Sequence, residues 1–291
     1  MYILFSERNR YFIYRSACDM RKGYDGLSGL VLNEFFTEGT YVVSGIDKGN
    51  YQVGLTAHTP QYIIGRFGIN LNIGQSSADL IYRWYDSNNF YWKNNFFPVL
   101  NFKAGIIYEL SKFNFSIRAN NMIVDKYVYL NGNAFPDQFN DAITINQVIA
   151  NKNFHYHYWH FDNIITYQKT DHEGIIHLPT WVSDQSLYFE KYYFDNALLA
   201  SFGLSANYNS SYYADAFMPA NSLFYLQNTT KTGGYLRLDL FINAQIKTAR
   251  IFLKMENAAD NLIENSYYLT PHYPMPGRVL KFGVVWKFLD Q

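Results

Sequence analysis

Leu280–Phe288 has the sequence LKFGVVWKF, and its regular alternation of side-chain types decides the fold class. Every even-numbered position is apolar or aromatic, whereas Lys281 and Lys287 stand at odd-numbered positions. Successive side chains of a β-strand point to opposite faces, so the even-numbered residues form one apolar row. A shift of one residue would replace part of that row with two lysines, and the facing of this strand is therefore strongly specified.

The same two-residue alternation recurs along the chain from about residue 41 onward. It is clear in five further stretches and weaker in three: Leu100–Tyr108, Phe113–Asn120, Leu198–Asn209, Leu236–Ile246 and Ala249–Glu256, then Phe67–Ile73, Ala78–Trp84 and Trp159–Gln168. Lys247 and Thr248 separate two of the clear stretches, which predicts an antiparallel hairpin with a short turn. No segment in this region has a comparably persuasive helical period. We therefore predict an all-β body.

The length of these stretches distinguishes between two antiparallel architectures. A soluble sandwich also has one apolar face per strand, but its strands usually contain about 5 or 6 residues. Several stretches here alternate for about 9 to 11 residues, the length that crosses a bilayer when a strand is tilted. The connections also alternate between short ones such as 110–112 and long ones such as 209–234, as they do in membrane barrels. The pattern favours a transmembrane β-barrel over the sandwich.

Aromatic residues make up 19% of the chain and crowd the ends of the alternating stretches. Membrane barrels place Tyr, Trp and Phe at both interfaces, where an amphipathic ring suits the level of the lipid headgroups. We therefore expect interfacial girdles built from the following residues: Tyr82, Trp84, Tyr85, Phe90, Tyr91, Trp92, Phe96, Phe97, Tyr192, Tyr193, Phe194, Tyr212, Tyr213, Tyr267 and Tyr268.

The overall composition excludes several classes of protein. Basic and acidic side chains are equal in number, 24 of each, so nucleic acid is not an expected partner. No run approaches the roughly 18 apolar residues that a membrane-spanning helix needs. Cys18 is the single cysteine, which excludes an intramolecular disulfide and a cysteine-rich metal site. The first 15 residues carry Glu7, Arg8 and Arg10 and lack the apolar core of a secretory signal.

Residues of about 35–291 resemble the C-terminal part of the "putative porin" family of Bacteroidetes, whose members are outer-membrane β-barrels. Four segments carry the resemblance: Tyr51–Tyr62, Tyr85–Phe96, Tyr127–Phe139 and Glu256–Phe288. The last is also similar to the closing hairpin of TonB-dependent receptors, where a loop containing Tyr-Pro-x-Pro-Gly-Arg precedes the terminal strand. Members of the porin family usually end at the final aromatic residue, whereas here three residues follow Phe288.

The first 34 residues resemble a different protein, the start of the second open reading frame product of IS66-type insertion sequences, which is a transposition accessory protein. Residues 11–31 carry this resemblance, especially the segment DMRKGYDGL at 19–27. The two resemblances divide the chain into an N-terminal fragment, 1–34, and a porin-like barrel portion, 35–291. The simpler explanation of the join is a gene fusion, in which a mobile element is joined to or inserted into a porin gene. The alternative is an N-terminal strand and short helix that happen to look similar to the accessory protein.

The porin resemblance implies an outer-membrane location and passive diffusion of small solutes through a polar lumen. It also implies contact with membrane lipid and recognition of the terminal strand by the barrel insertion machinery. About 250 residues supply roughly 10 to 12 antiparallel strands, which leaves room for an incomplete barrel beside a short α/β N-terminal fragment. Because an export signal and upstream strands are missing, we expect a truncated or fused product with poor function. The alternatives are a fragment of a TonB-dependent receptor and an IS66-type accessory protein.

The hydrophilic row of each alternating strand supplies the candidate pore lining. These side chains would hydrate a solute and filter it electrostatically, and their mixed signs give no firm charge selectivity. The alternative is a plugged lumen in which they only satisfy one another. The candidates are Asn101, Lys103, Ser116, Arg118, Ser201, Ser205, Asn207, Arg237, Asp239, Asn243, Arg250, Lys254, Lys281 and Lys287.

Residue patterns that would indicate an enzyme are missing from the sequence. There is no nucleophile elbow, phosphate loop or dinucleotide fingerprint, so we predict no catalytic residues and no cofactor. His155, His157 and His160 cluster in HYHYWH, but on one continuous strand His160 would point away from the other two. We therefore expect no metal site there, and these histidines face the interface or the lumen.

Overall fold

The fold is one large antiparallel sheet, seen in a computed structural model that describes residues 2–4, 35–260, 262 and 268–286. Within these residues the sheet has thirteen strands, and strands that follow each other along it are neighbours in space. Their bounds are β1 (Tyr2–Leu4), β2 (Phe35–Val42), β3 (Tyr51–His58), β4 (Arg66–Ser76), β7 (Val99–Leu110), β8 (Phe115–Asp125), β11 (Ala142–Tyr156), β12 (Trp159–Thr170), β13 (Trp181–Tyr193), β14 (Leu198–Asn209), β17 (Leu236–Ile246), β18 (Ala249–Glu256) and β21 (Val279–Trp286).

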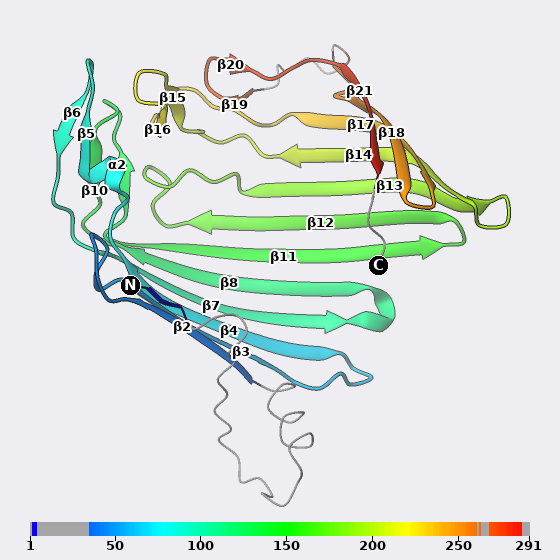
Figure 1. Cartoon of the computed structure of the whole chain (residues 1–291), viewed down its shortest axis with the longest axis horizontal. Coiled ribbons are helices and arrows are strands. Elements are labelled where there is room, and N and C mark those ends of the chain that lie inside the picture. Colours follow the sequence, from blue (N-terminus) through cyan, green and yellow to red (C-terminus); the bar gives the residue numbers. More distant parts are fainter. Residues whose placement is uncertain (1, 5–34, 261, 263–267, 287–291) are drawn as a thin grey trace, which may run out of the picture.

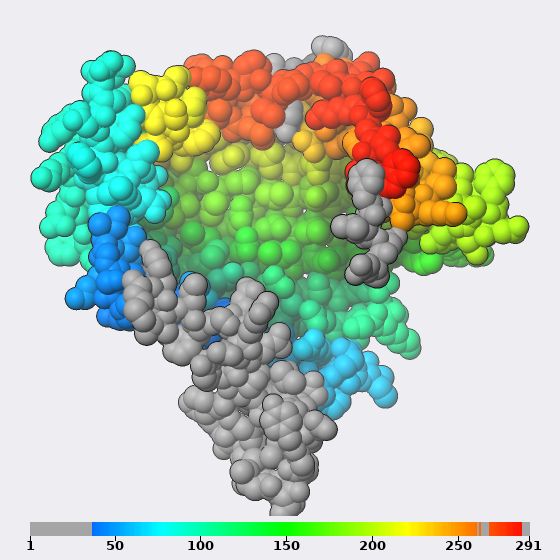
Figure 2. Space-filling model, in the orientation of Figure 1, coloured from blue at the N-terminus to red at the C-terminus, as the bar shows by residue number. Residues whose placement is uncertain are grey.

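Twelve of these strands contain eight or more residues, which confirms the predicted all-β class and strand number; the three-residue β1 is an addition. The sheet is strongly curved, with β2 and β3 near one border and β21 at the other (Figure 1). Figure 2 looks into the hollow of the sheet, whose floor is formed by its middle strands. Because the twelve long strands alternate in direction and are even in number, β2 and β21 run antiparallel to each other.

The connections divide into two sets at opposite ends of the strands. The short set comprises residues 59–65, 111–114, 157–158, 194–197 and 247–248. The long set comprises residues 43–50, 77–98, 126–141, 171–180, 210–235 and 257–278. This arrangement confirms the predicted alternation of short and long connections.

The long connections have secondary structure of their own. They contain a helical turn and four two-stranded hairpins: α2 (Leu80–Arg83), β5 (Trp84–Asp86) with β6 (Tyr91–Lys93), β9 (Val128–Leu130) with β10 (Pro136–Gln138), β15 (Ala216–Met218) with β16 (Leu223–Tyr225), and β19 (Tyr268–Thr270) with β20 (Tyr273–Pro274). The strand expected over Ala78–Trp84 is therefore wrong, since α2 occupies most of it. Trp92 Nε1 donates a 2.7 Å hydrogen bond to the Ile81 carbonyl and ties this turn to β6.

Most of the well-buried apolar side chains lie in the long connections rather than in the sheet. Apart from Ile143 on β11, every buried hydrophobic residue of the described chain lies in one of the long connections. Trp92, 5% exposed, stacks on Tyr85 at 4.8 Å between ring centroids, and it meets Phe90 and Phe135 edge-on. The predicted girdle is therefore wrong for Trp92, which forms part of a packed core.

Other members of the predicted girdle lie elsewhere. Tyr193 and Phe194 are exposed at the end of the sheet with the short connections, as a girdle requires, whereas the exposed Tyr192 points to the opposite face of β13 from Tyr193. Tyr267 lies outside the described residues. No helix of the described chain is both long and apolar enough to cross a bilayer.

Candidate functional site

The candidate site is the polar face of the sheet, and the strand register defines its members. Residues directly opposite each other in neighbouring strands share a face. Leu240 of β17 is paired with Leu204 of β14 and Met255 of β18, so these three residues lie on one face of the sheet. The pairs Ser205↔Asp239 and Phe241↔Lys254 lie on the other face. The register continues in the same way from β2 to β21.

The first of these faces is apolar and exposed. On β17, Leu240 is 46% exposed and Ile242 is 55% exposed, and on β21 Phe282 is 83% exposed. The large exposed hydrophobic residues of the long strands belong to this face, with the exceptions of Ile164, Tyr192 and Val285. No second layer of the described chain covers it, so the apolar rows do not meet in the interior of a sandwich.

The second face is polar, and its residues are more closely packed than those of the apolar face. All residues of the long strands that are buried in the described chain lie on it: Gly54, Gly68, Gly74, Gly105, Asn120, Ile143, Thr170, Ser201 and Asp239. Side chains on the inner side of a curved sheet converge and exclude solvent from one another. The polar face is therefore the hollow side seen in Figure 2.

The register places thirteen of the fourteen predicted lining residues on the polar face. Asn101, Lys103, Ser116 and Arg118 lie on β7 and β8, and the others lie on β14, β17, β18 and β21. Lys287 lies outside the described residues.

Asp239 is the centre of an ion network on this face. Its side chain is 1% exposed and receives Lys254 Nζ at 2.9 Å and an Arg237 guanidinium nitrogen at 3.3 Å. The backbone N–H of Asn257 also donates to Asp239 at 3.0 Å. Lys281 extends the network to Glu256 at 2.7 Å, so β17, β18 and β21 are joined by charges. A buried carboxylate needs several donors of this kind to offset the loss of its hydration.

Neutral side chains form a second network across the polar face. Ser186 and Ser205 are 2.8 Å apart across β13 and β14, and Asn243 donates to Ser201 at 3.3 Å. Further along the sheet, Asn120 donates to Gln147, which in turn donates to Gln168, each at 3.1 Å. The face therefore offers hydroxyl, amide and charged groups to water along its whole width.

A recess of about 300 Å³ lies on this face above β14. It is lined by Asp162, Ser186, Tyr188, Glu190, Leu199, Ser201, Ser205, Phe241, Asn243, Gln245 and Arg250, and the register assigns all of them to the polar face. The polar face of β14 forms the bottom of the recess, because the small residues Ser201, Gly203 and Ser205 leave space above its backbone. The sequence did not indicate Tyr188 and Glu190, because the alternation of polar and apolar residues in β13 is weak. Asp162 was not among the predicted lining residues, because the polar row of β12 was not included in them.

The histidine-rich segment also differs from expectation. β11 ends at Tyr156, residues 157–158 form a two-residue turn with His157 at φ 56°, and β12 returns from Trp159. His155 and His160 are therefore cross-strand partners on the same face, with rings stacked at 4.4 Å between centroids. The assumption of one continuous strand was wrong. Among the residues that the structure covers, no three His, Cys, Asp or Glu side chains are grouped so that they could hold a metal ion.

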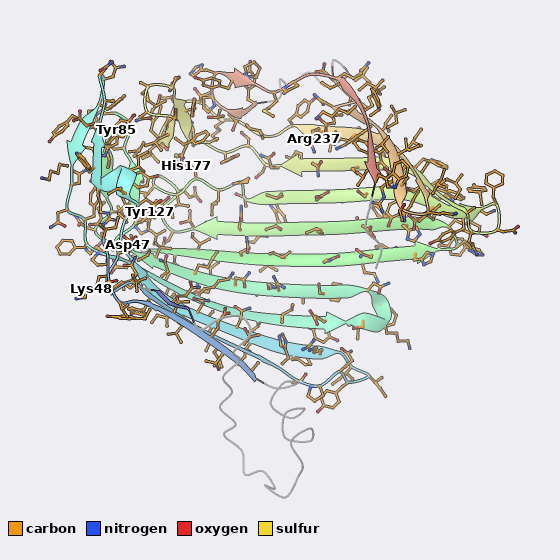
Figure 3. The ribbon with its side chains drawn as sticks, in the orientation of Figure 1. Asp47, Lys48, Tyr85, Tyr127, His177 and Arg237 are labelled. Carbon is orange, nitrogen blue, oxygen red and sulfur yellow. The ribbon has the colours of Figure 1, made fainter. Side chains whose placement is uncertain are left out.

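Polar contacts join the long connections to one another at one end of the polar face. His177, whose side chain is 3% exposed, lies with Nδ1 2.9 Å from Asp215 Oδ1 and with Nε2 2.9 Å from Asn228 Oδ1. Thr270 Oγ1 donates to the Asp215 carbonyl at 2.6 Å, which adds the connection 257–278. In Figure 3, His177 and Tyr127 lie at this end of the sheet, whereas Arg237 lies along β17.

In these connections Asp215 contributes to the raised pKa values of three tyrosines. Burial raises the pKa of Tyr127, and the Asp215 carboxylate and Tyr82 add to the effect. Burial followed by Asp215 raises the pKa of Tyr212, and burial, Asp79 and Asp215 do so for Tyr82. All three phenols therefore stay neutral at physiological pH, because the ionised form would lose hydration near a carboxylate.

Comparison with known proteins agrees with this geometry. Residues 32–290 match a family described as "Putative porin", and the match covers all of β2–β21. No curated protein is similar to the chain at a significant level. The N-terminal resemblance to an IS66-type accessory protein falls almost entirely on residues 5–34, outside those that the structure describes. With an exposed apolar face, a polar hollow face and a match over most of its length, the chain belongs to the "Putative porin" family.

Proposed function

We propose that the chain forms a wall of an outer-membrane pore through which small hydrophilic solutes diffuse passively. The observation that carries this proposal is the division of one curved sheet into an exposed apolar face and a polar hollow face. A continuous apolar surface across twelve long strands exceeds the patches that soluble monomers expose. Lipid is the environment in which such a surface is stable, and water is the one that suits the other face.

The dimensions of the apolar face suit a bilayer. The apolar row of β17 runs from Leu236 to Ile246, which corresponds to about 33 Å along the strand. At a tilt of roughly 45° this row spans about 23 Å, close to the roughly 25 Å apolar band of outer-membrane barrels. The partners proposed for the chain are therefore outer-membrane lipid on one face and small solutes on the other, with barrel insertion machinery acting on the terminal strand.

Transport in this proposal requires no chemistry from the protein. The lining candidates from Asn101 to Lys281 replace part of a solute's hydration and act as an electrostatic filter rather than as catalytic residues. The ion network around Asp239 holds the wall rigid, and the joined long connections frame one entrance. Since positive and negative side chains are both present on the polar face, the filter acts on size more than on charge sign.

Liposome swelling tests the proposal directly. The full chain, refolded into liposomes, should admit a pentose faster than a disaccharide and should exclude a large dextran, because diffusion through a water path falls with solute size. Planar bilayers containing the same protein should show discrete conductance steps, in place of the poor function expected from the sequence, because the twelve long strands form one continuous sheet. Heat-denatured protein is the control. Swelling rates and conductance equal to those of the control would contradict the proposed function.

A further inference from the structure

The recess above β14 has two walls of different charge, and this inference about its ligand rests on the proposed function of the polar face. Glu190 of β13, level with Ser201, stands on one wall, and Asp162 of β12 lies farther along the strands, level with Ser186 and Ser205. Arg250, from β18, stands on the opposite wall beside Gln245 of β17. The small residues Ser201 and Ser205 form the floor between them.

Glu190 and Arg250 have no ion-pair partner within the described chain, whereas Asp162 already interacts with the Tyr188 hydroxyl. Within the described part of the chain, neither Asp162 nor Glu190 nor Arg250 forms an ion pair within 4.0 Å. Arg250 donates one hydrogen bond, at 2.9 Å, to Gln245 Oε1, and a guanidinium has five N–H donors. This differs from the neighbouring network, where Asp239 and Glu256 are matched by Arg237, Lys254 and Lys281.

Aromatic rings supply an apolar surface in the same recess. Tyr188 and Phe241 line it, and their ring centroids are 6.3 Å apart across Gly203 of β14. His160 covers the other side of Tyr188 in a parallel stack at 4.7 Å, which fixes the orientation of that ring. An apolar group of a ligand can therefore rest against rings that are already held in place.

We propose that this recess binds a small zwitterionic solute, of which a free α-amino acid with an apolar side chain is the simplest. The ammonium group lies toward Glu190, the carboxylate accepts hydrogen bonds from Arg250, and the side chain rests against Tyr188 and Phe241. Arg is well suited to carboxylates because its planar fork can donate two parallel hydrogen bonds. A volume of about 300 Å³ suits one small molecule of this kind.

A set of four related probes tests the assignment by calorimetric titration of the folded full chain in detergent micelles. Phenylalanine carries both charges, phenethylamine lacks the carboxylate, phenylpropionate lacks the ammonium, and glucose lacks all three recognition elements. Phenylalanine should bind at least about tenfold more tightly than either singly charged probe, because each charge-assisted hydrogen bond contributes that much affinity. Equal binding of glucose and phenylalanine, or of phenylpropionate and phenylalanine, would overturn the proposal.

Variants assign each charge to a wall of the recess. Arg250→Gln should weaken phenylalanine and phenylpropionate by about tenfold and leave phenethylamine unchanged. The variant Glu190→Gln should do the reverse. Lys48→Gln and Glu173→Gln remove the same charges from exposed connections and should have no effect. If Arg250→Gln weakens all three probes equally, the wall assignment is wrong.

The titration is independent of transport and so separates the two proposals. A chain that gives solute-dependent swelling but binds no phenylalanine refutes the subsite and leaves the pore intact. A chain that binds phenylalanine with the predicted variant pattern but gives no swelling or conductance supports the subsite and refutes the pore.

Discussion

Asp239 illustrates how a single charged residue can stabilise the polar face. It is 1% exposed and accepts from Lys254, Arg237 and the Asn257 backbone at 3.3 Å or less. Asp239→Ala would leave these donors without their partner, and the expected loss is about 3 kcal/mol of unfolding free energy. Denaturant unfolding in micelles measures it. Asp184→Ala, which removes an exposed carboxylate from the same face, should cost much less, and equal losses would contradict the role of the network.

Asp171 carries a prediction about pH at the end of β12. Burial opposes ionisation, but the His172 side chain and the Thr144 N–H donate to this carboxylate and hold its pKa below the usual value. A lowered pKa means that the ionised side chain stabilises the fold above its normal pKa and that this contribution is lost as the pH falls through the lowered value. Asp171→Asn should therefore speed exchange of the Thr144 amide at pH 7.

The same comparison at low pH supplies the control for Asp171. When the carboxylate is protonated in the parent chain, the two proteins should exchange the Thr144 amide at similar rates after correction for intrinsic exchange. A difference that persists unchanged to pH 2 would show that the carboxylate charge is not the cause.

At the scale of elements, the facing of β17 can be tested by placing an arginine on one face of the strand or on the other. Leu240 lies near the middle of the apolar row, and Asn243 lies on the polar face of the same strand. Leu240→Arg should cost about 2–4 kcal/mol in lipid, the range for Arg at the midplane of an outer-membrane barrel. Asn243→Arg should cost clearly less, because its side chain points to water. Unfolding titrations in bilayers measure both, and equal costs would reject the assigned facing.

The elements show what the sequence could predict and why. Strands with a clean alternation, such as β14, β17 and β18, were predicted nearly to the residue, because burial of one face fixes the period. β11 and β13 were missed. Ile143, Ile145 and Ile149 lie on the polar face of β11, and Lys152 lies on its apolar face, so the two-residue pattern is blurred. Their places are fixed by neighbouring strands rather than by their own sequence.

The connections were the least predictable part. Rings at the ends of strands were expected to meet lipid, but Phe90 and Trp92 pack against Phe135 from another connection, and Tyr85 stacks on Trp92. Contacts between segments so far apart in sequence leave no local pattern. The polar face of the lining candidates could be predicted for the same reason as the strands, and their role in a pore stays a prediction, whereas the recess required the spatial neighbours of β14.

At the scale of the whole molecule, the two borders of the sheet matter most. Edge N–H and C=O groups cannot be satisfied by lipid, and each costs several kcal/mol there. The three-residue β1 pairs with residues 40–42 of β2 at one border, and β21 is the other border. Because β2 and β21 run antiparallel, an even-stranded wall can close if β21 pairs with the remainder of β2. We expect amides of β21 to exchange slowly in bilayers and faster in micelles that allow opening. Fast exchange along β21 in bilayers would contradict closure.

We expect alternate residues of each long strand to face lipid and water in turn. Spin labelling of β17 is the direct test of this facing. Single cysteines at positions 236–246, in a Cys18→Ser background, would carry nitroxide labels in reconstituted bilayers. Collisions with oxygen should peak at even positions such as Leu240 and Ile242, and collisions with a water-soluble nickel complex should peak at odd positions such as Arg237 and Asn243. Even positions inaccessible to both reagents would place the apolar row in a protein interior and contradict the account.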